Sequence, residues 1–94
     1  MNPVYAQSKD VVYRKIADEY VLVPIRHKAV DLKSIYTLDE VGAFIWNQID
    51  GKRTLRDIRD RVLDEFDAAP DEALRDVAEM CSSFESLRLT EKLL

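Results

Sequence analysis

The side chains that most often carry covalent or metal chemistry are scarce in this sequence of 94 residues. It holds one cysteine, Cys81, and one histidine, His27, which are too few for the usual zinc sites. Cys81 lies on the apolar stripe of a predicted helix with no histidine beside it, so we expect a buried structural thiol and not a nucleophile. An internal disulfide is excluded because there is no second cysteine.

The 18 acidic residues do not form a recognisable catalytic pair. In the predicted second helix, acids alternate with arginines in a pattern typical of a solvated, salt-bridged surface. They are Asp57, Asp60, Asp64 and Glu65, interleaved with Arg56, Arg59 and Arg61. Two glycines, Gly42 and Gly51, are too few for a glycine-rich phosphate loop. We therefore expect a protein that is not an enzyme and needs no cofactor.

Length and composition predict one small globular domain. Hydrophobic residues make up 47% of the chain and charged residues 34%, a balance that disfavours disorder. We expect a flexible tail over residues 1–10 and the domain over residues 11–94. No run of about 18 apolar residues is present to span a membrane, and the start lacks the apolar segment of a signal peptide. With its single thiol, the chain is expected in the reducing cytoplasm.

The first half of the domain predicts strands. Apolar and polar residues roughly alternate from Val11 to Ala17, and Tyr20–Val23 is an apolar, β-branched run. Regular pairing of this second strand should weaken near Pro24, because proline cannot donate to a ladder. A third strand is expected within residues 30–36, best over Lys33–Tyr36.

The second half predicts three helices. Thr37 or Asp39 can cap the first helix, which ends before Gly51. Thr54 begins a capping-box pattern for the second helix, and the third follows Pro70. Three strands followed by three helices make an α+β fold.

Two residues of the first predicted helix concern packing. Gly42 costs helix propensity, which fits either tolerance near a helix end or a close backbone approach to a neighbouring element. We favour the close approach. Trp46 lies one residue off the main apolar stripe and is expected at a half-buried boundary.

Strands beside a pair of helices also fit a winged helix-turn-helix that binds DNA. The helix that would enter the groove, residues 71–88, carries Arg75 and Arg88 against five acids, a charge of −3. Phosphate repulsion would oppose such binding, and the chain as a whole carries −4. A third alternative is a general protein-interaction or oligomerisation domain, and the oligomeric state is left open.

The last of three strands in a meander lies at a sheet edge with unpaired backbone groups. Such an edge can bind another chain by strand addition, in which main-chain hydrogen bonds give affinity and side-chain pockets give specificity. The flank of the third helix could form the wall of a groove beside it.

One stretch of this sequence resembles the PqqD-like family, also called RiPP recognition elements. The resemblance rests on Tyr36-x-Leu38-Asp39-x-x-Gly42-x-x-Ile45-Trp46, then Ile49-Asp50-Gly51-Lys52-Arg53-Thr54, and then Ile58 and Phe66. It extends over roughly residues 11–90. It implies a winged helix-turn-helix-like fold, with a three-stranded antiparallel sheet followed by three helices and no catalytic residues.

The resemblance also implies a peptide chaperone. Such proteins hold the leader of a ribosomally made precursor as an added strand between the third strand and the third helix. They present it to a modifying enzyme, often a radical S-adenosylmethionine (SAM) protein; no nucleic acid or membrane is implied as a partner. The peptide-binding residues expected from the strand and from helical spacing are Lys33, Ser34, Ile35, Tyr36, Arg75, Ala78 and Ser82. With Lys33 and Glu79 near the groove, we expect a leader of mixed charge.

Overall fold

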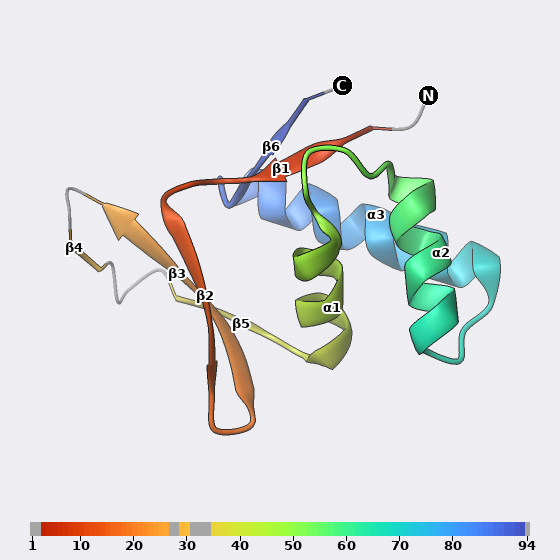
Figure 1. Ribbon diagram of the computed structural model, residues 1–94, viewed down its shortest axis with the longest axis horizontal. Helices are drawn as coiled ribbons and strands as arrows, with labels where there is room; N and C mark the ends of the chain where they lie inside the picture. The colour runs from red at the N-terminus through yellow and green to blue at the C-terminus, as the bar shows by residue number, and fades with distance from the viewer. Residues whose placement is uncertain (1–2, 27–28, 31–34, 94) are drawn as a thin grey trace.

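The computed structural model describes residues 3–26, 29–30 and 35–93. Strands and helices follow one another in an α+β arrangement (Figure 1). In chain order they are β1 (Tyr5–Gln7), β2 (Val11–Ile16), β3 (Glu19–Arg26), β4 (Ala29–Val30), β5 (Tyr36–Leu38), α1 (Glu40–Gln48), α2 (Leu55–Glu65), α3 (Pro70–Ser86) and β6 (Thr90–Lys92). The predicted fold class, an antiparallel sheet followed by three helices, is confirmed.

Strand β3 is the centre of the main sheet. It pairs with β2 in a hairpin on one edge, and with the short strands β4 and β5 on the other, always antiparallel. The predicted third strand is thus seen as two described pieces, and β5 continues to Leu38, where the sequence predicted the onset of helical periodicity. Leu38 belongs to the strand because its side chain, 4% exposed, packs in the core.

Hydrogen bonding along β3 alternates between its two neighbours. The Ile25 N–H donates to the Asp10 carbonyl on the β2 side at 2.7 Å. The backbone N–H and C=O groups of successive residues in a strand point to opposite neighbours. The nitrogen of Pro24 therefore faces the other edge of β3, on the side of β5. Strand β3 nevertheless stays paired through Pro24, with β2 at Val11 and with β4 at Ile25 and Arg26, so the predicted weakening of its pairing near Pro24 was wrong.

The start of the chain departs from the prediction of a flexible tail over residues 1–10. Strand β1 pairs with β6, and Val4 and Tyr5 are buried. The Leu93 N–H donates to the Val4 carbonyl at 2.7 Å. This strand could not be predicted from the sequence, because it has only three residues and its partner lies at the other end of the chain.

The core joins the helices to the sheet through aromatic rings. Phe84 of α3 is fully buried, and the Trp46 ring meets it edge to face with centroids 5.3 Å apart. Trp46 is 1% exposed, so the prediction of a half-buried boundary position was wrong. Cys81 is buried as predicted, and desolvation raises the pKa of its thiol to about 12, which leaves it unreactive.

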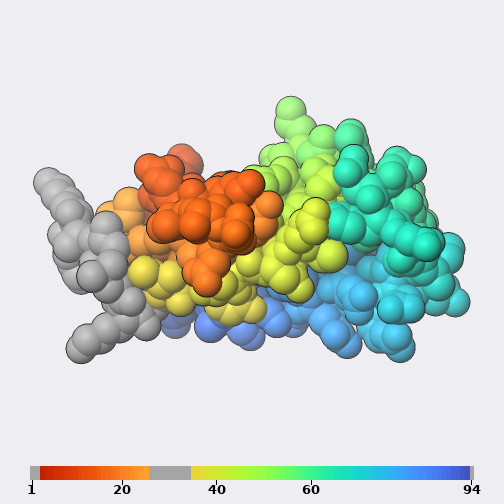
Figure 2. Space-filling model, turned by 90° about the horizontal axis from the view of Figure 1, so that it is seen from below, coloured from red at the N-terminus to blue at the C-terminus, as the bar shows by residue number. Residues whose placement is uncertain are grey.

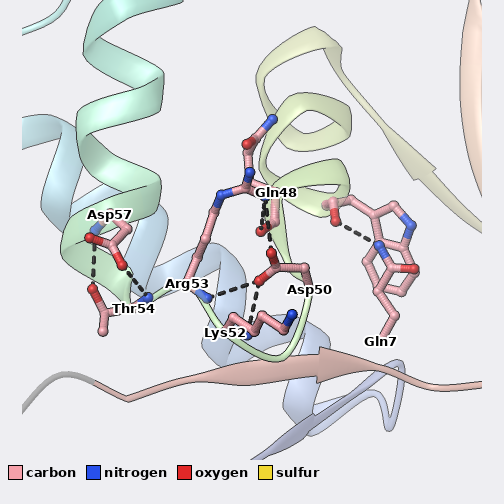
Figure 3. Close-up of polar contacts among 8 residues, drawn as sticks. Gln7, Gln48, Asp50, Lys52, Arg53, Thr54 and Asp57 are labelled. Carbon is pink, nitrogen blue, oxygen red and sulfur yellow. Dashed lines mark hydrogen bonds and ion pairs between the residues drawn. The ribbon is translucent and has the colours of Figure 1, made fainter.

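The link between α1 and α2 satisfies its own polar groups (Figure 3). The Asp50 carboxylate accepts from the backbone N–H groups of Lys52 and Arg53, each at 2.9 Å. These hydrogen bonds hold the pKa of Asp50 below its usual value. Gly51, with φ +81°, takes the left-handed conformation in the turn between Asp50 and Lys52.

Helix α2 begins with the predicted capping box, also drawn in Figure 3. The Asp57 N–H donates to the Thr54 hydroxyl at 3.1 Å, and the Thr54 N–H donates to the Asp57 carboxylate at 3.0 Å. The residue types from Asp50 to Thr54 are therefore explained by the hydrogen bonds that they make with the backbone of this link.

Helix α3 ends without a glycine. Arg88 takes the left-handed conformation in its place, at φ 61°. The Leu89 N–H then donates to the Phe84 carbonyl, and the Arg88 N–H to the Glu85 carbonyl, as in a Schellman motif. Among the described residues, no helix is long and apolar enough to cross a membrane.

Candidate functional site

The outer edge of β5 is the first part of the candidate site. The backbone N–H and C=O groups of Tyr20 and Leu22 in β3 point toward β5. Their partners in the register, Leu38 and Tyr36, therefore point their own backbone groups toward β3. The N–H and C=O of Thr37 therefore point outward. Within the described part of the chain, no strand pairs with this outer edge.

A groove of about 370 Å³ runs beside this edge, between β5, the start of α1 and one flank of α3. It is lined by Tyr36, Asp39, Val41, Ile45, Asp76, Glu79, Met80 and Ser83. Figure 2 shows the yellow atoms of β5 between the orange β2–β3 hairpin and the blue atoms of α3. The groove is thus placed where a strand added to β5 would pack its side chains.

The apolar part of the groove is well supported from below. Tyr36 packs edge to face on Phe84, with ring centroids 6.1 Å apart, and Ile45 is only 1% exposed. A Cβ atom on Gly42 would lie 3.3 Å from the Met80 terminal methyl, which confirms the predicted close approach. Gly42 therefore gives Met80 room at the base of the groove.

The polar part of the groove is acidic. Of the eight lining residues that the structure describes, three are Asp or Glu and none is Lys or Arg. Asp39 also caps α1, accepting from the Gly42 N–H at 2.7 Å. Asp76 and Glu79 are exposed, and neither side chain makes a hydrogen bond or ion pair with the residues that the structure describes.

The predicted strand residues are only partly placed. Tyr36 lies in β5 and lines the groove. Ile35 immediately precedes β5, is 40% exposed and is not among the lining residues. Lys33 and Ser34 lie outside the described residues. Thr37, whose outward backbone groups matter most, was missed because edge orientation depends on the pairing register of β3.

The predicted helix residues do not line the groove. Arg75, Ala78 and Ser82 lie about a third of a turn around α3 from the lining set. The lining residues of α3 are Asp76, Glu79, Met80 and Ser83. A buried stripe has two flanks, and the sequence does not say which flank faces the sheet. The i, i+3, i+4, i+7 spacing of the four lining residues shows that they share one face of the helix, and this pattern could have identified them in the sequence.

The site offers little to a metal or a nucleophilic mechanism. Across the described ranges, no cluster of three or more His, Cys, Asp and Glu side chains could hold a metal ion. What the arrangement offers is an open backbone edge, an apolar floor and a carboxylate wall.

The sequence profile of the coenzyme PQQ synthesis protein D (PqqD) family matches residues 19–89. This match covers β3 to the end of α3 and includes every lining residue of the groove. The chain belongs to the PqqD family. The resemblance noted in the sequence is thereby confirmed, and it places the groove within the part that the family shares.

A solved structure supports the fold. The chain is similar to TbiB1 in a complex with the TbiA(beta) leader peptide, at a TM-score of 0.75 and 24% sequence identity. The alignment covers 95% of this chain and 98% of that one. At this identity the likeness establishes the fold alone. No curated protein matches the sequence.

Proposed function

We propose that this protein is a leader-peptide-binding recognition element. In this proposal, the leader of a ribosomally synthesised precursor pairs with the outer edge of β5 and packs its side chains into the groove against α3. The observation that carries the proposal is the outward N–H and C=O of Thr37 beside that groove. Membership of the PqqD family, and the leader peptide bound to TbiB1, support the same reading.

Strand addition suits this edge. An extended chain gains main-chain hydrogen bonds there, and alternate side chains enter the pockets. The proposed contacts are Tyr36 and Thr37 on the strand side, with Asp76, Glu79, Met80 and Ser83 on the helix side. Lys33, Ser34 and Ile35 on the strand side and Arg75, Ala78 and Ser82 on the helix side stay predictions from the sequence.

The proposal makes the protein a chaperone and not an enzyme. It would hold the leader and present the rest of the precursor to a modifying enzyme such as a radical SAM protein. It would act in the cytoplasm, where Cys81 stays reduced. DNA binding fits less well, because Asp76 and Glu79 on α3 would repel phosphates.

The proposal is tested by titrating the ¹⁵N-labelled protein with the leader of a precursor encoded beside its gene. We expect shifts in the amide resonances of Tyr36–Leu38 and of residues 76–83. Thr37→Pro removes the outward donor without removing a bond to β3, and proline is tolerated at sheet edges. The dissociation constant should rise about tenfold, because one peptide carbonyl loses its partner.

Thr37→Val is the matched control, since it changes the side chain but keeps the N–H. It should bind within about twofold of the wild type, as expected for a change at an exposed side chain. If Thr37→Pro and Thr37→Val bind the leader equally, the peptide does not add to this edge and the proposal fails.

A further inference from the structure

The carboxylates of the groove bear on which peptide it accepts, and the inference drawn from them rests on the proposed function above. The sequence predicted a leader of mixed charge from Lys33 and Glu79. Lys33 lies outside the described residues, and the described lining holds three carboxylates with no cation. The charged residues of the described lining are therefore all acidic.

We propose that the groove selects leader segments that carry Lys or Arg two residues from an apolar side chain. Residues two apart in a strand face the same side, about 6.6 Å from each other. Met80 and Asp76 are one helical turn apart, about 6 Å along α3. A strand lying along the groove can therefore place its apolar side chain over Met80 while its basic side chain reaches Asp76.

The two acids of α3 are free to make this contact. Asp76 and Glu79 stand three residues apart on the groove flank, and neither is engaged by another described residue. Arg75 is four residues before Glu79, but no ion pair joins them in the structure. A basic peptide side chain would meet two carboxylates, whereas an acidic one would be repelled by both.

The apolar subsite should be less selective than the charged one. Met80 is flexible and adapts to side chains of different shape. A Cβ atom on residue 42 would lie 3.3 Å from the Met80 terminal methyl, so Gly42 leaves the end of this side chain room to adapt. The groove should therefore select more strongly for a basic residue two positions from the apolar one than for any particular apolar residue.

The experiment is a selection from a random dodecapeptide library displayed on phage, with the full chain as bait. From the wild type we expect peptides with Lys or Arg two positions from an apolar residue, and depletion of Asp and Glu. The variant Asp76→Asn/Glu79→Gln should keep the apolar preference and lose the basic one. Its control, Asp64→Asn/Asp67→Asn, removes the same charge from exposed residues outside the groove and should select like the wild type.

A selected peptide is then compared with its Lys→Gln counterpart by fluorescence polarisation at low salt. The wild type should bind the Lys form about threefold to tenfold more tightly, as expected for two partly exposed ion pairs. The double variant should bind both forms equally. Added salt should narrow the difference in the wild type.

Each outcome separates this inference from the proposed function. Selected peptides without a basic preference, or the same preference in the Asp76→Asn/Glu79→Gln variant, overturn the inference alone. Peptides selected equally well by Thr37→Pro overturn strand addition itself. Failure of the wild type to enrich any peptide overturns both.

Discussion

The link between α1 and α2 and the groove beside β5 treat their polar groups in opposite ways. The link directs the Asp50 carboxylate onto two backbone N–H groups and closes with the Thr54–Asp57 capping box. The β5 edge and the groove leave the outward backbone groups of Thr37 and the side chains of Asp76 and Glu79 without partners among the described residues. A group satisfied within the chain stabilises the fold, whereas a group left unpaired at the surface is available to a ligand.

This contrast predicts that substitutions in the link lower the stability of the fold and leave peptide binding unchanged. Substitutions in the groove should weaken peptide binding and leave the stability nearly unchanged. Phe84 is the exception, because it is buried in the core and also supports Tyr36.

Phe84→Ala should destabilise the protein by about 3–5 kcal/mol, because it removes a fully buried ring and leaves a cavity. Urea denaturation followed by circular dichroism measures the loss. Phe84→Leu should cost less and keep the fold. It should still weaken leader binding, since Tyr36 loses its edge-to-face contact. Unchanged affinity in Phe84→Leu would mean that this support does not matter to the groove.

Gly51→Ala should cost about 1–2 kcal/mol, because an L side chain disfavours the left-handed backbone at φ +81°. Space is not the cause, since an added Cβ would lie 3.7 Å or more from its neighbours. Gly51→Asn is the control and should cost less, because asparagine tolerates this conformation. The free energy of unfolding measures both, and leader affinity should not change. Equal losses in the two variants would contradict a conformational origin.

Asp50 predicts how stability depends on pH. Backbone hydrogen bonds from Arg53 and Lys52 lower its folded-state pKa beneath the usual 3.8. Its contribution to stability is therefore present above about pH 4 and is lost as the pH falls through the folded-state pKa. Between pH 5 and pH 2.5, the wild type should lose more unfolding free energy than Asp50→Asn, which does not titrate. Equal losses would show that these bonds do not favour the ionised carboxylate.

Asp76→Asn/Glu79→Gln should change the unfolding free energy by no more than about 0.5 kcal/mol, as is usual for exposed residues without partners. Thr54→Ala, in the link, should cost about 1 kcal/mol by removing the helix cap. Thermal and urea unfolding of the two variants compare the regions directly. A larger loss in the groove variant than in the cap variant would invert the comparison.

Local features of the sequence were enough to predict much of this fold. The capping box at Thr54 and Asp57 and the hairpin of β2 and β3 were predicted, and Asp39 was one of the two caps predicted for α1. Each depends on residues within a few positions of one another, whose spacing fixes their interactions. The buried thiol of Cys81 followed in the same way from its place on a helical stripe.

What remained depended on contacts between distant segments. The pairing of β1 with β6 joins the two ends of the chain, and no local pattern reports it. The burial of Trp46 depends on Phe84, which arrives from another helix. The flank of α3 that lines the groove is set by how the helix packs against β5, since an amphipathic stripe has two equivalent borders. Most helices and strands, and the helix caps, thus follow from the amino-acid sequence, because those interactions are local. The edge and the flank that face each other follow from the folded arrangement, because they depend on packing across the whole domain.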